Sequence, residues 1–543
     1  MFDIPELDDM VILQLNRHDL AQCSRVSRTW HRIVVPYLWA VFDCSIQSQR
    51  AFYRLVRESY LLERQSQELQ AQDHSTEQHA QESTLPMPLL AKYGRWIRQL
   101  PCPDSLWMRL QSHSHSSQPQ QGLNEGENEE PTNYDLMRHL YKHCPALQVH
   151  RFRQISSHLG SDNFLKTISE HIIPRTQHLH LYGDSLEIWR PMYLLDHGSN
   201  VLESLTIDVT NMYSRDDRGQ EEAQKEAKPW ILKQLSLLRS RNYWAARWFW
   251  SWLWKRCGQV EQLEVVHVRD LLQILVEGIR MHMPNLDKLI LRESNSSDND
   301  VAALLSSSHH GWREITLRGK LTAIKGPAME VLMQQCPVLE KLVVDRCEYF
   351  PGGDTVRVLA SSPNLHTLID SIDHTSMTTR IHASIFADRY PHTGSLREWA
   401  CEASLTSLRI RITGVPRPDV PRCRVLESHP GQGREIQSQV YDRLARLTKL
   451  ESLWLGERIF PRGQFDCLEL SLESGLHKLS GLKSLKELGV VSLALKVGVE
   501  EVQWMTENWP ELRTIYGMGL PNESPYKEAV EWLQRNRPDI RLK

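Results

Sequence analysis

The chain has 543 residues, of which 41% are hydrophobic and 24% are charged. This length exceeds what one ordinary core supports, so we expect several domains or an extended repeat array built from a folded rather than a disordered chain. The 64 Lys and Arg residues nearly balance the 67 Asp and Glu residues, which gives a formal net charge of -3 and disfavours nucleic acid or an anionic membrane as a partner.

Cysteine usage and the distribution of apolar residues indicate the compartment. The 10 cysteines form no Cys-x-x-Cys pair, and the N-terminus has early acids and Pro5 where a signal peptide has a basic flank and an apolar stretch. No run approaches the roughly 20 apolar residues of a membrane-spanning helix. We therefore expect free thiols, no transmembrane helix and a cytoplasmic or nuclear location.

The first 40 residues predict short helices. Pro5 begins an apolar segment that predicts a helix over residues 5–15. A second helix is predicted to start at Asp19 and to end at Pro36, with its apolar residues along one face. The residues of that face are Leu20, Cys23, Val26, Trp30 and Ile33.

This segment resembles an F-box. Ile4-Pro5-Glu6-Leu7 stands where that family has its Leu-Pro start, residues 19–30 match its "D-L-x-x-C-x-x-V-x-x-x-W" segment, and Leu38-Trp39 resembles its closing "L-W". The resemblance implies a three-helix module over residues 1–45 that docks on a Skp-type adaptor and, through it, on a cullin-RING ubiquitin ligase. The adaptor-binding residues that it implies are Ile4, Pro5, Leu7, Leu20, Val26 and Trp30. The alternative is a helical cap on a repeat array, which needs the same amphipathic pattern.

Two low-complexity stretches lie between this module and residue 131. Residues 65–83 and about 111–131 are rich in Gln, Ser, His and Glu, so we expect mobile insertions. We interpret residues 46–90 as a helical, low-complexity linker, in which a helix over residues 51–69 continues into the first stretch or gives way to a loop. Regulatory tails are the alternative for both stretches.

A short pattern, apolar-x-x-apolar-x-apolar, recurs from residue 91 onward. Its alternation predicts brief strands with one buried face. Successive first positions from 202 to 365 differ by 30, 28, 26, 26, 27 and 26 residues, close to the leucine-rich-repeat period. The copies begin at Leu202, Leu232, Val260, Leu286, Trp312, Leu339, Leu365, Leu450, Leu485 and Leu512, with weaker ones at Leu147 and Thr176.

Helical segments separate these strands and often end in a proline turn, as at Cys336-Pro337-Val338. Such copies resemble the cysteine-containing class of leucine-rich repeats that follows an F-box in substrate receptors, and the segment from residue 399 to 419 resembles fungal families of this type. The resemblance implies an α/β fold over residues 91–543, a solenoid with parallel strands on the concave face and helices on the convex face. Between residues 365 and 450, two frames fit, Leu396/Trp399/Cys401 and Leu405/Leu408/Ile410.

No motif predicts catalysis. The chain lacks a Gly-rich phosphate loop, a nucleophile elbow and a His-Glu-x-x-His helix, and neither His113-Ser114-His115 nor any other Cys or His set has ligand spacing on a defined helix or hairpin. Cys144, Cys257, Cys336 and Cys347 lie near strand boundaries, where packing explains them. We expect no catalytic residue, no metal and no cofactor in a non-enzymatic protein.

An aromatic run over residues 243–254 predicts a helix, either buried on the convex side or exposed as an anchor for a partner. Polar residues between the apolar strand positions are predicted to lie on the concave surface and to bind a protein through Lys288, Lys341 and Trp454. Trp454 is either such an anchor or a cover over the neighbouring repeat. The function predicted is a substrate-recognition adaptor of an SCF-type ligase with an unidentified protein substrate, and the alternative is a repeat scaffold without ubiquitin function.

Overall fold

The computed structural model describes residues 15, 17–40, 46–73, 89–97, 133–145, 147, 149–152, 166, 168–181, 186–187, 189–197, 200–208, 212–213, 228–238, 247–266, 272–292, 296–319, 324–345, 350–371, 381–417, 425–456, 467–490, 493–518 and 526–543. The chain divides into two compact units, residues 1–260 and 261–543. Ile4, Pro5, Leu7 and the predicted helix over residues 5–15 lie outside the described residues, apart from Leu15.

Unit 1 begins with a pair of packed helices, α2 (Arg17–Val26) and α3 (Arg28–Ala40). Leu20 and Val34 form their core, and Leu38 and Tyr37 pack against it. The single helix predicted from Asp19 to Pro36 is wrong: the chain forms two helices that are interrupted at Ser27, and the second continues through Pro36 to Ala40. The ring removes one backbone donor, but burial of the apolar residues on both sides of Pro36 outweighs that loss.

A long helix follows this pair. Helix α4 (Ile46–Asp73) packs against α5 (Leu89–Tyr93) and α7 (Asn133–His143), and η1 (Gly94–Trp96) continues from α5. Of the two expectations for the linker, the helix is confirmed, and it extends to Asp73. Residues 74–88 and the insertion at 111–131 lie outside the described residues.

Unit 1 then forms the first repeats. Strands β1 (Val149–Phe152), β2 (His178–Leu181), β4 (Ser204–Asp208) and β6 (Gln234–Leu238) pair in parallel in that order. A short parallel pair, β3 (Leu186–Glu187) and β5 (Met212–Tyr213), runs beside them. The connecting elements are η3 (Ile168–Ile172), η4 (Ile173–Arg175), α9 (Trp189–His197) and α11 (Arg247–Trp254).

Helix α11 carries the described part of the aromatic run. Phe249, Trp250, Trp252 and Trp254 are at most 3% exposed, so the buried interpretation is confirmed for these residues, while Trp244 lies outside the described residues.

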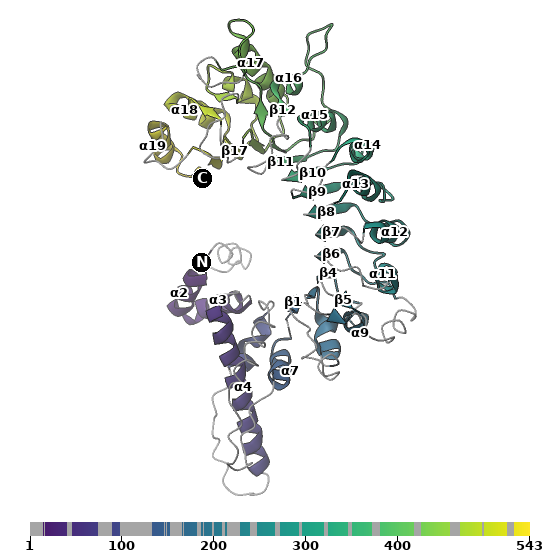
Figure 1. Ribbon diagram of the computed structural model, residues 1–543. Coiled ribbons are helices and arrows are strands. Elements are labelled where there is room, and N and C mark those ends of the chain that lie inside the picture. The colour runs from purple at the N-terminus through teal and green to yellow at the C-terminus, as the bar shows by residue number, and fades with distance from the viewer. Residues whose placement is uncertain are drawn as a thin grey trace, which may run out of the picture. The chain divides into compact units, whose positions relative to one another are not determined.

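Unit 2 is a parallel ladder whose strands lie on one side and whose helices lie on the other (Figure 1). Its strands, in spatial order, are β7 (Gln262–Val266), β8 (Lys288–Arg292), β9 (Glu314–Arg318), β10 (Lys341–Asp345), β11 (Thr367–Ser371), β13 (Ser407–Arg409), β15 (Ser452–Trp454), β17 (Glu487–Gly489), β19 (Thr514–Tyr516) and β20 (Arg541–Leu542). Two side pairs accompany them, β12 (Ile381–His382) with β14 (Ile412–Thr413) and β16 (Glu469–Leu470) with β18 (Ala494–Leu495).

The helices of unit 2 connect successive strands. They are α12 (Leu272–His282), α13 (Asp298–Leu305), α14 (Gly326–Gln335), α15 (Gly352–Ser361), α16 (Ala383–Phe386), α17 (Gln432–Ala445), η5 (Leu476–Gly481), α18 (Val499–Asn508) and α19 (Lys527–Asn536). The predicted α/β solenoid is therefore confirmed, with strands at each predicted repeat. Strand β13 selects the frame Leu405/Leu408/Ile410, whereas Trp399 and Cys401 are buried residues of the preceding turn.

Backbone hydrogen bonds set the register of this ladder. The carbonyl of Asp287, just before β8, accepts hydrogen bonds from the next repeat's Arg313 N at 2.8 Å and Glu314 N at 3.1 Å. The same double acceptance recurs at Glu261, Arg313 and Glu340. Leu289 and Leu291 are each 1% exposed, so β8, like β7 and β9, buries alternate side chains toward the helices and presents the others on the opposite face. Strand β10 departs from this pattern, because Val343 is buried as well.

Candidate partner-binding surfaces

The helical module places its three described adaptor candidates differently. Leu20 is 6% exposed and belongs to the module's own core, and Trp30 is partly buried against that core. Val26, at the end of α2, is 71% exposed. Of the three, Val26 is thus the side chain most available to a partner, and Leu20 acts by keeping the two helices together.

The face of the unit 2 strands that points away from the helices carries its polar residues in rows. Register pairs Lys288 with Glu314 and Glu314 with Lys341, so the first row alternates in sign. Lys288 Nζ lies 2.8 Å from Glu314 Oε1, and Lys341 Nζ lies 3.4 Å from Glu314 Oε2. One carboxylate therefore bridges both lysines that the sequence predicts to bind a partner.

These contacts change the ionisation of Glu314. Burial alone would raise its pKa, but the hydrogen bond from Lys288 and the charge of Lys341 outweigh burial and hold the pKa below its ordinary value. The hydrogen bond to Glu314 raises the pKa of Lys288. The row is therefore a charge-paired surface at neutral pH.

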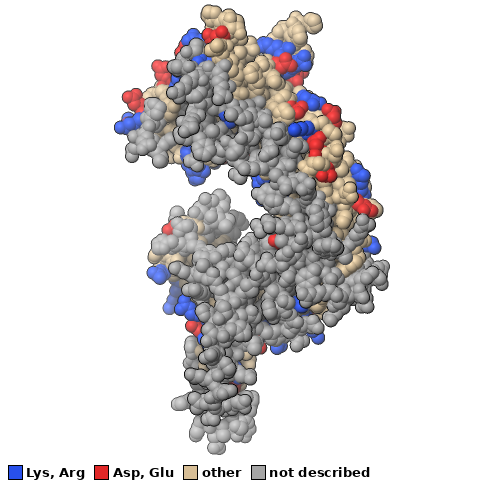
Figure 2. Space-filling model, in the orientation of Figure 1, with Lys and Arg blue, Asp and Glu red and all other residues tan. Residues whose placement is uncertain are grey.

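Further ion pairs continue the pattern beside this row. Arg292 Nε lies 3.0 Å from Glu264 Oε1 one strand away, and Arg313 joins Asp287 to Glu340 across the next two repeats. Burial raises the pKa of Asp287 above its ordinary value, although the positive charge of Arg313 acts to lower it. On the face of unit 2 seen in Figure 2, Lys and Arg side chains likewise lie among Asp and Glu side chains.

The C-terminal strands carry a different group, which we call the Trp454 cluster: Arg409, Trp454, Tyr516 and Lys543. The rings of Trp454 and Tyr516 lie 4.3 Å apart between centroids. The Arg409 guanidinium lies 4.7 Å from the Trp454 ring centre, and the Lys543 ammonium lies 5.3 Å from that of Tyr516. Two cations thus flank two rings that contact each other at an interplanar angle of 35°.

Gly489 makes this cluster possible. It pairs with Trp454 on one side and Tyr516 on the other, so the two rings meet across the strand that carries it. A Cβ at Gly489 would lie 2.3 Å from Trp454 Cδ2. Trp454 therefore covers the neighbouring repeat, which is one of the two roles predicted for it, and part of its side chain stays exposed. Sequence reasoning missed Arg409, Tyr516 and Lys543, although repeat alignment places each in the same row.

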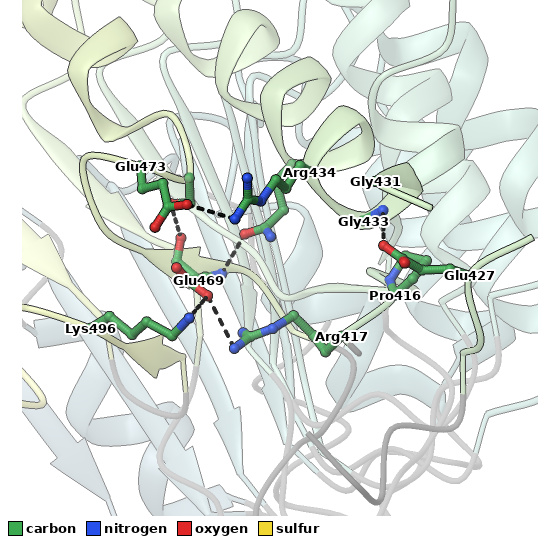
Figure 3. Close-up of a pocket in the computed structure, with 11 residues that line it drawn as sticks. Pro416, Arg417, Glu427, Gly431, Gly433, Arg434, Glu469, Glu473 and Lys496 are labelled. Carbon is green, nitrogen blue, oxygen red and sulfur yellow. Dashed lines mark hydrogen bonds and ion pairs between the residues drawn. The ribbon is translucent and has the colours of Figure 1, made fainter. Parts of the chain in front are cut away.

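A polar pocket of ≈ 320 Å³ lies on the helix side of the later repeats, at the start of α17. Arg417 and Lys496 converge on Glu469, at 3.1 and 3.0 Å, and Arg434 pairs with Glu473 (Figure 3). Gln437 Oε1 accepts a hydrogen bond from the backbone amide of Glu469 at 2.9 Å. Each of these three cations has an acid partner, so the pocket presents paired charges to a ligand.

The first turn of α17 is shaped by Gly433. Its amide donates to Glu427 Oε1 at 2.9 Å, and a Cβ there would lie 2.2 Å from the Pro416 carbonyl oxygen. The close approach of the two backbones needs glycine. We interpret the pocket as the polar joint between α17 and the side pair β16–β18.

The cysteines near strand boundaries are buried. Burial raises the pKa of Cys144 to about 12 and raises that of Cys257 further, so neither thiol is an ionised nucleophile at neutral pH. Cys336 is also buried, and Cys347 lies outside the described residues. Among the residues that the structure describes, no helix has the length and apolar character needed to cross a membrane.

The first row of ion pairs makes stability depend on acid. Because the folded-state pKa of Glu314 lies below its ordinary 4.5, the stabilisation is fully present above that value and is lost as the pH falls through the folded-state value. Glu314→Gln should therefore lower the free energy of unfolding at pH 7 and flatten its decline in acid, measured by urea denaturation. Glu507→Gln, at an exposed site on α18, is the control; an acid profile of Glu314→Gln that matches wild type would contradict the pairing.

The Trp454 cluster can be tested by a double-mutant cycle. Gly489→Ala should cost about 1–3 kcal/mol of unfolding free energy because its Cβ would overlap the Trp454 ring. In a Trp454→Ala background, the same change should cost less than about 0.5 kcal/mol, since the overlapping ring is gone. Urea denaturation measures all four chains, and an equal cost in both backgrounds would show that Gly489 serves another purpose.

Comparison with known proteins bears on the N-terminal module. Residues 10–45 match the family model described as F-box-like. No curated protein matches the chain. One similar solved structure is the crystal structure of the Rad7 and Elc1 complex in yeast, at 13% sequence identity and a TM-score of 0.38, covering 72% of this chain and 88% of that chain. A likeness of that strength carries no inference about partners. Residues 10–45 are thus an F-box-like domain, and an α/β solenoid with a parallel sheet follows it.

Proposed function

We propose that this protein is a non-enzymatic substrate-recognition subunit of an SCF-type cullin-RING ubiquitin ligase. The F-box-like domain would dock on a Skp-type adaptor, and the strand face of the solenoid would hold a protein substrate. The observation that carries the proposal is the F-box-like match at residues 10–45 in one chain with a repeat solenoid. The buried cysteines at strand boundaries support assignment of the repeats to the cysteine-containing class.

The chemistry of the strand face supports a protein partner. The lysines and arginines of β8, β9 and β10 are matched with acids on neighbouring strands, which interrupts any basic track for a phosphate backbone along these described strands. The Trp454 cluster adds aromatic area and cations of the kind that dominate protein interfaces. A folded or extended polypeptide with acidic and aromatic groups fits such a surface.

A cap without ubiquitin function is the second candidate, and one contact favours it. Trp39, at the end of α3, stacks on Tyr93 with ring centroids 4.8 Å apart. Since Tyr93 precedes η1, this contact joins the module to the segment that leads into the repeats. A cap needs such contacts, whereas adaptor docking needs an exposed apolar surface on the module.

Val26→Asp tests adaptor docking without disturbing the module's core. Because Val26 is 71% exposed, the substitution should leave folding intact and reduce capture of a purified Skp-type adaptor by at least about tenfold, the effect of one charge in an apolar contact. Capture is measured by affinity co-purification with the full chain.

Two matched variants complete that experiment. Leu426→Asp places the same charge at a site on unit 2 that is 81% exposed and should not change adaptor capture. Leu20→Asp should unfold the helix pair, and circular dichroism would detect the loss of helix. This variant should also fail to capture the adaptor. Wild-type protein that fails to capture the adaptor, or Val26→Asp protein that captures it fully, would favour the cap.

The substrate surface is tested with Trp454→Ala combined with Tyr516→Ala. Loss of the two rings should reduce recovery of substrate proteins cross-linked to the chain in cells by at least about tenfold, because aromatic anchors carry much of an interface's energy. Adaptor recovery should stay unchanged, as read by quantitative mass spectrometry. Leu426→Ala is the control, and unchanged recovery with the double variant would place the substrate on loops or on the helix side.

A further inference from the structure

Three side chains that can ligate a metal meet where α4 packs on α7. Glu63 lies on α4, and His139 and His143 lie one helical turn apart on α7. One ligand atom from each residue lies within 4.8 Å of the other two. The two histidines share a helix face because residues at i and i+4 project in the same direction. This spacing was the sequence signal for the pair, and sequence reasoning missed it.

The ligand atoms point toward one another. Glu63 Oε2 lies 2.8 Å from His143 Nε2 and 3.3 Å from His139 Nδ1. The two imidazole rings stand edge to face with centroids 4.6 Å apart. The side chains of His139, His143 and Glu63 are 4%, 16% and 22% exposed, so the group is shielded but not sealed from solvent.

Surrounding groups orient two of these ligands. The Lys142 ammonium contacts Glu63 Oε1, the carboxylate oxygen turned away from the histidines, and leaves Oε2 toward them. On the far side of the His139 ring, Nε2 lies 2.9 Å from Ser59 Oγ. A metal-bound histidine usually donates its second ring N–H in this way, which directs the lone pair of the other nitrogen to the metal.

We propose that Glu63, His139 and His143 bind a zinc ion that joins α4 to α7. Two imidazole nitrogens and one carboxylate oxygen are a set that zinc accepts at about 2.0–2.2 Å, with a fourth position left for water. The separations of Glu63 Oε2 from the two ring nitrogens are close to those between ligand atoms of a tetrahedral site, so small side-chain rotations suffice. Lys142, which is 59% exposed, is free to turn outward on a flexible stem.

Such a site would hold together parts of the chain that are distant in sequence. Glu63 and His143 are 80 residues apart, and residues 98–132 between them are not among those described. Because the unfolded chain does not gather the three ligands, zinc would bind the folded state and stabilise it. The alternative is a hydrogen-bonded polar cluster without metal.

The test uses the purified full chain, stripped with EDTA and then dialysed against zinc chloride. Plasma mass spectrometry should find one more zinc ion per chain in wild type than in Glu63→Gln or His143→Gln. His197→Gln, at an exposed histidine on α9, is the matched control and should retain the wild-type amount. Zinc should raise the thermal midpoint of wild type and of the control by several degrees, and it should leave the two site variants unchanged.

A second measurement needs no variant. Cobalt added to the stripped wild-type chain should give visible absorption of a cobalt site with nitrogen and oxygen ligands, and zinc should remove it at one equivalent. Equal zinc in all four chains, or no cobalt spectrum, would overturn the proposal. Site variants that lower the thermal midpoint equally with and without zinc would show a polar cluster only.

Discussion

The parallel register of the strands is the constraint from which the other features of unit 2 follow. A single strand cannot bury Leu289 and Leu291 by itself, so each repeat depends on the next one. The double acceptance by the Asp287 carbonyl fixes the step between repeats, and neighbouring strands lie about 4.8 Å apart. Side chains at equivalent positions are therefore forced into contact along a row, whatever their chemistry.

Each row must then resolve the contacts that the register imposes. Lys288 on β8 and Lys341 on β10 carry like charges in one row, and Glu314 on β9 lies between them and offsets their repulsion. Large rings need more width than one strand spacing provides, and Gly489 leaves the space in which Trp454 meets Tyr516. The same geometry thus yields a charge-paired surface in one part of the ladder and an aromatic cluster in another.

Sequence reasoning succeeded where the signal is local. The repeat pattern predicted the main strands through β19, because the pattern that marks each strand spans only six residues. Strand β20 and the strands of the side pairs are two residues long, which is too short to show this pattern. Pairings across repeats were harder: Gly489 looks like any glycine until β15 and β19 flank it. Glu63 and His139 come together only because α4 packs on α7. Leu20 and Val26 share a predicted apolar face, but α3 packs against Leu20 and leaves Val26 exposed.

The strand face is organised before any partner arrives, and this affects what it can recognise. Lys288 and Trp454 already have fixed neighbours, so binding would order few additional side chains and lose little conformational entropy. A partner that only supplied negative charge would have to displace Glu314 from two lysines and would gain little. Selectivity should therefore come from shape against the Trp454 cluster and from acids that reach Arg409 or Lys543, with the paired charges acting against mismatched partners.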